Sequence, residues 1–218
     1  MSPAERREAI VAATLAVMQR RGIAATTVRD VAAELGTSSG LIHHYYSSMD
    51  ELLAEAFERI ARADLQETVA AVAAGDSPLE RLRLFFDTYA RADTDAGMQI
   101  WLDAWAEAAR RPAVQRTSRR LNEEWQALLA EVIADGCANG VMTTDDPDAA
   151  AWRVLSLLDG LSLQVVAHGD VLSDEQADAW SREATERELG LSPGTVLPQR
   201  VLPHRVLPHR VLTRSAAE

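Results

Sequence analysis

The stretch TTVRDVAAELGTSSGLIHHYY, residues 26–46, places two short helical patterns on either side of Gly36. The first pattern is amphipathic and lasts two turns, with apolar residues at Val28, Val31, Ala32 and Leu35. Gly36 stands where the chain must turn sharply, a position that commonly needs a positive φ. The stretch therefore predicts two short helices joined by a tight turn.

The second pattern is polar on its outer face. Thr37 or Ser38 can cap it, and Leu41 or Ile42 faces inward. The residues expected to face outward are Ser39, His43, His44 and Tyr45. This order is typical of a helix-turn-helix, whose second helix lies in the DNA major groove. Short hydroxyls suit that place because they donate and accept near phosphates and base edges. An ordinary helical hairpin is the alternative.

Composition indicates a folded helical protein. Of the 218 residues 47% are apolar and 25% charged, and the single cysteine, Cys137, excludes an intramolecular disulfide. No apolar run approaches the roughly 20 residues that a bilayer span requires. Residues 1–22 are amphipathic and lack the apolar core of a signal peptide. We expect a cytoplasmic protein with no membrane partner.

The distribution of charge matters more than the net charge of −11. All the basic side chains are arginines, and residues 1–50 carry five of them against five acids. Residues 51–195 carry 13 arginines against 27 acids, a net −14. A neutral head can approach phosphate, whereas the acidic body is repelled by it.

Capping signals and helical spacing recur along the rest of the chain, and no stretch before residue 190 alternates as a half-buried strand does. Capping boxes begin at Ser2, Ser48, Ser77 and Ser173, and helices are also expected to start at or near Pro3, Pro112 and Pro147. We therefore predict an all-α fold of nine helices.

After Pro193 the sequence becomes a near-perfect five-residue repeat, VLPQR, VLPHR, VLPHR and VLTR, from Val196 to Arg214. A period of five fits neither helix nor strand, and each proline removes a backbone donor. We expect residues 191–218 to form a poorly ordered tail. A phosphate contact through its arginines, or metal binding by His204 and His209, is the functional alternative.

The region from Gly22 to Leu53 resembles the DNA-binding head of the TetR family of transcriptional regulators. The resemblance rests on TTVRDVA at 26–32, GTS at 36–38, GLIHHYY at 40–46 and SMDELL at 48–53. The segment at Asp159 to Leu161 is similar to the BetI-type subgroup. The resemblance implies a helix-turn-helix domain at 1–47 and an effector-binding and dimerisation domain at 48–190.

The resemblance also implies which residues meet DNA. Two positions depart from the family pattern: His43 replaces a phosphate-contacting tyrosine, and Met49 replaces a lysine. The loss of these contacts puts more weight on Arg29 and on an arm at Arg6 and Arg7. The implied DNA-binding residues are Thr27, Arg29, Thr37, Ser38, Ser39, Gly40, His43, His44 and Tyr45.

Five tryptophans are many for a chain with three tyrosines and three phenylalanines. They can simply fill the core, as aromatic residues at helical spacing usually do. The alternative is an effector cavity, which acids such as Asp103, Glu124 or Asp159 would adapt to a cationic or amphipathic molecule. The candidate lining residues are Phe86, Tyr89, Trp101, Trp105, Trp125 and Trp152.

An operator that is read by two identical heads requires a homodimer. The last two predicted helices are the candidates for the interface, and Gly160, which weakens a helix interior, would allow close helix approach. The candidate interface residues are Val154, Leu157, Gly160, Leu161 and Trp180.

The sequence therefore predicts an effector-responsive repressor that binds a palindromic double-stranded DNA operator as a dimer. A small ligand would release it by changing the spacing of the heads through the long helix that starts at Ser48. The alternative is a helical ligand-binding or scaffold protein whose DNA binding is weakened or lost. No nucleophile and base, and no metal cluster, stand at useful spacing, so we expect no enzyme, cofactor or metal.

Overall fold

The computed structural model describes the backbone of residues 2–92 and 95–197, with all side chains in these ranges except those of residues 90–92, 95, 96 and 170. The described residues form nine α-helices and one short 3-10 helix, with no strand, as predicted. The helices are α1 (Pro3–Arg21), α2 (Val28–Glu34), α3 (Ser39–Tyr45), α4 (Met49–Ala73), α5 (Pro78–Ala92), α6 (Asp95–Ala108), α7 (Pro112–Ala138), α8 (Pro147–His168), η1 (Gly169–Val171) and α9 (Asp174–Glu188).

Helix starts follow the capping signals. The side chains of Ser2, Thr27 and Ser173 each accept a hydrogen bond from the backbone three residues on, and the side chain there returns it, which completes three capping boxes. At the start of α7 the cap comes from another helix, because the Asp50 carboxylate of α4 accepts a 2.9 Å hydrogen bond from the Ala113 N–H. This bond ties the beginning of α4 to α7.

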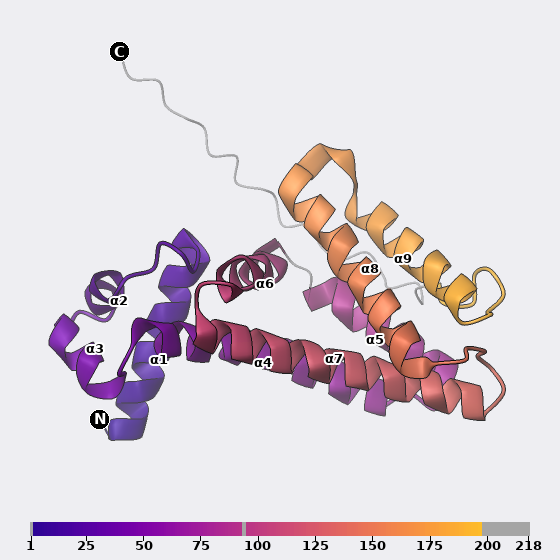
Figure 1. Cartoon of the computed structure of the whole chain (residues 1–218), viewed down its shortest axis with the longest axis horizontal. Helices are drawn as coiled ribbons and strands as arrows, with labels where there is room; N and C mark the ends of the chain where they lie inside the picture. Colours follow the sequence, from indigo (N-terminus) through magenta and orange to yellow (C-terminus); the bar gives the residue numbers. More distant parts are fainter. Residues whose placement is uncertain (1, 93–94, 198–218) are drawn as a thin grey trace, which may run out of the picture.

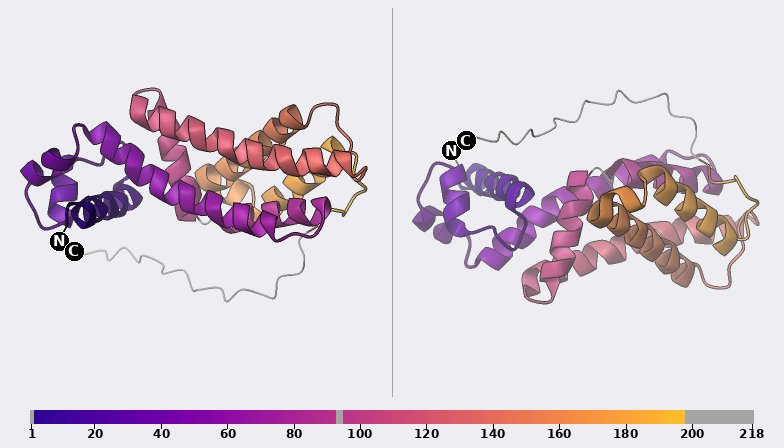
Figure 2. Two further views of the ribbon diagram at one scale, coloured as in Figure 1. Left: turned by 90° about the horizontal axis from the view of Figure 1, so that it is seen from below. Right: turned by 90° about the horizontal axis from the view of Figure 1, so that it is seen from above.

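The molecule is elongated, with α1, α2 and α3 forming a head at one end (Figures 1 and 2). Helix α4 runs from the head into the body, where it packs against α5 and α7, and α8 packs on α7 and α9. Helix α6 lies between the head and the body and contacts α1, α4, α7 and α8. One continuous apolar core extends from Ile10 in the head to Val196.

The chain after α9 stays packed further than residue 190, where we expected the tail to begin. Val196 is fully buried, and the buried Glu186 carboxylate accepts hydrogen bonds from the Gly194 and Val196 N–H groups at 2.9 and 2.7 Å. The Arg182 guanidinium, itself buried, donates to the Val196 carbonyl at 2.9 Å. The repeat, including its arginines and His204 and His209, lies outside the described residues beyond Leu197.

Helix α8 is the most apolar long helix described. Its apolar window of 18 residues has a mean hydropathy of 1.3, so among the described helices it alone passes a test of length and composition for crossing a membrane. This is weak evidence, because core helices of globular proteins pass the same test. A third of the window is buried in the protein, and the helix carries Arg153 and Asp159.

Candidate nucleic-acid interface and internal cavity

The turn between α2 and α3 is built as the sequence predicts. Gly36 has φ of 65°, a conformation that L side chains rarely adopt. The Thr37 N–H donates to the Ala32 carbonyl at 2.9 Å and the Gly36 N–H to the Ala33 carbonyl at 3.2 Å, the bond pair of a Schellman motif. A Cβ at Gly36 would meet nothing within 4 Å, so its backbone conformation, not space, requires glycine. This turn sets the direction of α3.

Helix α3 lies at the tip of the head and presents a polar surface (Figure 1). Ile42 anchors it in the core, whereas His43 and His44 are exposed. Ser38 is the N-cap residue without a side-chain cap, and within the described part of the chain its hydroxyl and those of Thr37 and Ser39 have no hydrogen-bond partner. Three hydroxyl groups beside the turn are therefore available to a ligand. Gly40 is also exposed.

Tyr45 is only partly available. Its ring is half-buried, packs against the core and meets the His44 ring edge-on, with centroids 5.2 Å apart. Thr27 is exposed as the N-cap of α2, but its hydroxyl is bonded to the Asp30 carboxylate at 2.5 Å. Met49, at the family's lysine position, is partly buried and packs against the core.

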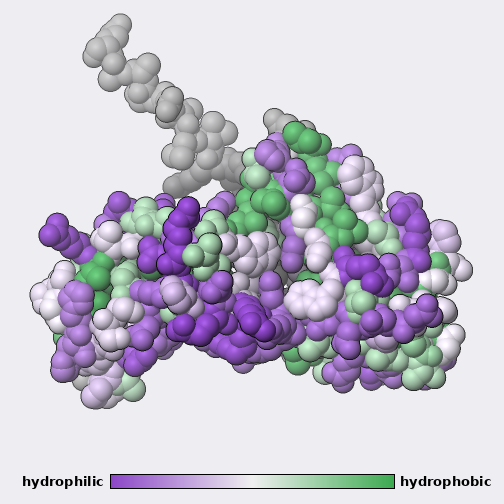
Figure 3. All heavy atoms as spheres, in the orientation of Figure 1, coloured by the Kyte–Doolittle hydropathy of each residue, from purple (hydrophilic) through white to green (hydrophobic). Residues whose placement is uncertain are grey.

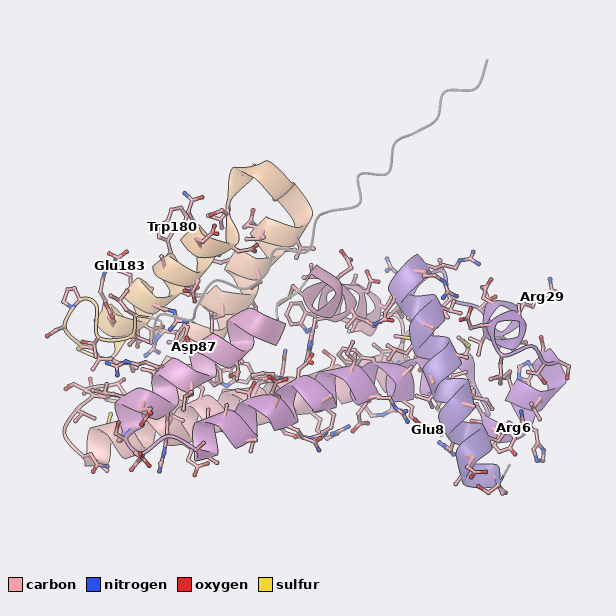
Figure 4. All side chains as sticks on the ribbon, turned by 180° about the vertical axis from the view of Figure 1, so that it is seen from behind. Arg6, Glu8, Arg29, Asp87, Trp180 and Glu183 are labelled. Carbon is pink, nitrogen blue, oxygen red and sulfur yellow. The ribbon has the colours of Figure 1, made fainter. Side chains whose placement is uncertain are left out.

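Ion pairs occupy three of the five arginines in the head. Arg7 pairs with Glu55 at 2.6 Å, Arg20 with Glu34 at 2.5 Å, and Arg21 with Asp30. Arg6 and Arg29 have no ion pair within the described residues, and both project from the head (Figure 4). The guanidinium of Arg7 also lies over the Tyr46 ring, 4.7 Å from its centroid. The arm expected at Arg6 and Arg7 is thus reduced to Arg6.

A cavity of about 30 Å³ lies inside the body, where five helices meet. The Trp101 and Trp105 rings of α6 are 5.7 Å apart between centroids, and the Tyr89 and Trp125 rings meet edge-on at 5.8 Å. Residues from α4 through α8 form its wall: Asp64, Tyr89, Met98, Trp101, Trp105, Asn122, Trp125, Leu155 and Asp159.

Two carboxyl groups face this aromatic wall. Asp159 of α8 accepts a 2.7 Å hydrogen bond from the Tyr89 hydroxyl. The side chain of Asp64 has no hydrogen bond or ion pair within the described residues, and burial, followed by the charge of Glu67, raises its pKa to about 6. The buried Nε1–H of Trp105 also lacks a partner there. The cavity therefore combines aromatic faces, negative charge and an unused donor.

Some of the residues that line this cavity were predicted from the sequence. Tyr89, Trp101, Trp105 and Trp125 line the cavity together, as does Asp159. Phe86 faces a neighbouring cavity, and Trp152 lies 42% exposed on α8, outside the cavity wall. Asp103 and Glu124 do not face the cavity either, because Asp103 accepts a hydrogen bond from the Ile23 N–H at 3.3 Å and Glu124 pairs with Arg62.

Four lining residues were missed: Asp64, Met98, Asn122 and Leu155. Asp64 left a signal, since it stands four residues after Ile60 on the apolar stripe of α4, where a charge is unexpected.

The predicted interface residues divide between surface and core. Trp180 is 51% and Leu157 36% exposed, Gly160 is exposed and Leu161 half-buried. Trp180 points away from the body (Figure 4), and apolar surface gathers over α8 (Figure 3). Val154 is 4% exposed and lies at the bottom of a groove between α8 and α9, so little of its side chain is available to a second copy.

Comparison with known proteins places both parts of the chain. A family model described as BetI-type transcriptional repressor, C-terminal, matches residues 78–190, and one described as bacterial regulatory proteins, tetR family, matches residues 10–56. The HTH-type transcriptional regulator BetI of Stenotrophomonas maltophilia is 31% identical over 163 residues, which cover 73% of this chain and 80% of that protein. BetI 1 of Chromohalobacter salexigens is 29% identical over 198 residues, 88% and 94% of the two chains.

Solved structures agree in fold. A putative transcriptional regulator from Saccharomonospora viridis, solved in complex with choline, has a TM-score of 0.76 at 26% identity and covers 85% of this chain and 98% of its own. A putative transcriptional regulator from Pseudomonas aeruginosa PAO1 has a TM-score of 0.74 at 27% identity, with 86% and 91% covered.

Proposed function

Because this chain belongs to the TetR family of bacterial transcriptional regulators, in its BetI-type branch, we propose that it is a dimeric repressor released from its operator by a small quaternary ammonium cation. The observation that carries the proposal is the cavity in which four aromatic rings meet Asp64 and Asp159. Aromatic faces attract a cation most strongly when water is excluded, and choline-like cations are a recurrent case.

The charge of the ligand follows from the two carboxyl groups. Within the described residues the Asp64 side chain has no hydrogen bond or ion pair, and burial disfavours its charged form. A cation bound beside it would favour that form. An anionic effector would meet like charge from Asp64 and Asp159. The choline complex of the S. viridis regulator supports the same class of ligand for this chain.

The DNA face is α3 with the turn before it. The free hydroxyls of Thr37, Ser38 and Ser39 would meet phosphates or base edges, and Arg29 and Arg6 would supply charge. The exposed His43 and His44, Gly40 and the accessible edge of Tyr45 complete this surface. Thr27, bonded to Asp30, would contribute chiefly by placing α2.

Two copies would pair through α8 and α9. Their outer surface carries the exposed side chains of Leu157 and Trp180, beside Leu161. A Cβ at Gly160 would meet nothing within 4 Å inside the protomer, so packing within the chain does not account for the glycine. Close approach of a second α8 would account for it. Such pairing would also cover the apolar surface of α8.

The test is a mobility shift with the DNA upstream of the protein's own gene, at low and moderate salt, in the presence of choline. We expect a shifted complex that weakens with salt and is released by choline. The neutral isostere 3,3-dimethyl-1-butanol is the matched control, and it should release far less complex because it lacks the charge. Release by both compounds alike would contradict a cation-selective site.

A second candidate function is a ligand-binding helical protein with weakened DNA binding. His43 and the buried placement of Met49 favour it, since both lack the phosphate contact of the family pattern. It predicts choline-dependent tryptophan quenching without any shifted complex at low salt.

A further inference from the structure

A second cavity, of about 150 Å³, lies next to the aromatic one and is the larger of the two. It is enclosed by α5, α8 and α9. Its wall is formed by Phe86, Tyr89, Leu158, Leu161, Ser162, Asp174, Ala177, Asp178 and Ser181. The proposed function uses none of this space apart from Tyr89.

Tyr89 separates the two cavities, because its side chain lines both. Its ring packs edge-on against Trp125, and its hydroxyl is bonded to Asp159 across the aromatic cavity at 2.7 Å. A ligand contact can replace the hydrogen bond between the Tyr89 hydroxyl and Asp159, and the loss of that bond favours rotation of the side chain. Rotation of Tyr89 would join the two spaces.

The volumes decide how a ligand can fit. A cavity of about 30 Å³ holds roughly two waters, far less than a trimethylammonium group requires. A cation that enters must displace side chains of the wall, and displacement of Tyr89 would extend the space toward the second cavity, which Tyr89 also lines. The space around the charged head of the ligand would then be continuous with the second cavity.

The second cavity suits an uncharged chain. Phe86, Leu158, Leu161 and Ala177 supply apolar wall. Arg182 pairs with Asp178 and with Asp87, at 2.8 Å each, and the Ser181 hydroxyl is already bonded to the Ala177 carbonyl at 2.7 Å. Asp174, at the start of α9, adds a carboxyl group to this wall. The apolar part of the wall favours alkyl groups.

We propose that the effector is an elongated quaternary ammonium compound, whose charged head lies among the aromatic rings while its chain passes Tyr89 into the second cavity. This inference rests on the proposed function, because it takes the cationic head as given. It adds the chemical class of the remainder of the molecule, an alkyl or hydroxyalkyl chain longer than that of choline.

The test is a tryptophan-fluorescence titration of the full-length protein with tetramethyl-, ethyltrimethyl-, propyltrimethyl- and butyltrimethylammonium. Each added methylene should tighten binding roughly fourfold, the effect of burying one CH₂. Ala177→Leu fills part of the second cavity and should reduce the preference for the butyl compound to less than about a tenth of its wild-type value. Ala179→Leu, which adds the same volume on the exposed side of α9, should retain the wild-type preference.

The outcomes separate the two proposals. If none of the four cations changes the fluorescence, the cationic effector itself is wrong. If tetramethylammonium binds but the butyl compound binds no more than about twofold tighter, or the preference survives in Ala177→Leu, the second cavity takes no ligand chain. Binding of tetramethylammonium by Ala177→Leu reports that the body of the variant is folded. If this variant does not bind tetramethylammonium, the smaller substitution Ala177→Val takes its place.

Discussion

Asp64 places a carboxyl group on the apolar stripe of α4, and its burial there changes its pKa. Its carboxyl group has a pKa of about 6 instead of 3.8, because burial and then Glu67 disfavour the charged form. Its contribution to stability is therefore present below pH 3.8 and is lost as the pH rises through 6. Asp159 and Tyr89 face the same cavity and are hydrogen-bonded to each other at 2.7 Å.

We expect Asp64→Asn to remove this loss. As the pH rises from about 4 to about 6.5, the free energy of unfolding of the variant should increase relative to that of wild type. The difference should reach about 1 kcal/mol, because solvent screens the half-exposed group. Denaturant unfolding at several pH values measures the difference, and Glu131→Gln, which removes an exposed carboxylate of α7 that has no ion pair within the described residues, is the control. Choline affinity should rise with pH through the same range in wild type only. Parallel pH profiles of wild type and Asp64→Asn would disprove this role.

Arg29 is the strongest candidate for a phosphate contact in the head, because it is exposed and has no ion pair within the described residues. Arg29→Ala should weaken operator binding and reduce the slope of log affinity against log salt by about one. Arg116→Ala removes an exposed arginine of α7 that likewise has no ion pair there, and it should leave the slope unchanged. Equal slopes for wild type and Arg29→Ala would remove this residue from the interface.

Among the elements, α6 joins the cavity to the head. Its Trp101 and Trp105 line the cavity, while its Asp103 accepts a hydrogen bond from the Ile23 N–H just after α1. Gly22 leaves the room for this contact, since a Cβ there would lie 2.9 Å from the Asp103 carboxylate. A ligand that displaces the tryptophan rings would therefore move a helix that touches the head.

Asp103→Ala should weaken the coupling and spare ligand binding. We expect choline affinity within about twofold of wild type, but a smaller choline-induced loss of operator affinity, because coupling between two sites requires a shared element. Paired titrations, by fluorescence for choline and by mobility shift for DNA, measure both quantities. Ala106→Ser, at an exposed position three residues later on α6, is the control. Unchanged coupling in Asp103→Ala would show that another route dominates.

The elements were predictable to the extent that their signals are local. The capping signals at Ser2, Ser48 and Ser173 and the glycine at 36 located helix ends, because each acts within a few residues. Packing between distant helices is not local. Spacing could not tell that Trp152 faces away from the cavity while Leu155, one turn on, lines it. Nor could it show that Val154 is covered by α9.

In the whole molecule, the proposed binding of one operator by two heads requires a dimer that forms through α8 and α9. Trp180→Asp places a charge in the proposed interface, where an unpaired charge is costly. We expect a monomer at micromolar concentration in sedimentation velocity, whereas the wild type sediments as a dimer. Val69→Asp is the control, because Val69 is an apolar residue that is 45% exposed, as Trp180 is 51% exposed, but lies on α4, outside the proposed interface. A wild-type monomer would refute the interface.

The most direct measurement of the central claim is selection of bound sequences from random duplex DNA by the wild-type protein, with and without choline. We expect an inverted repeat whose two half-sites are separated by about one helical turn of DNA or a multiple of it. Choline should abolish the enrichment of this repeat. Enrichment of a single unrepeated half-site, or of no sequence at all under low salt, would contradict two α3 helices reading one duplex.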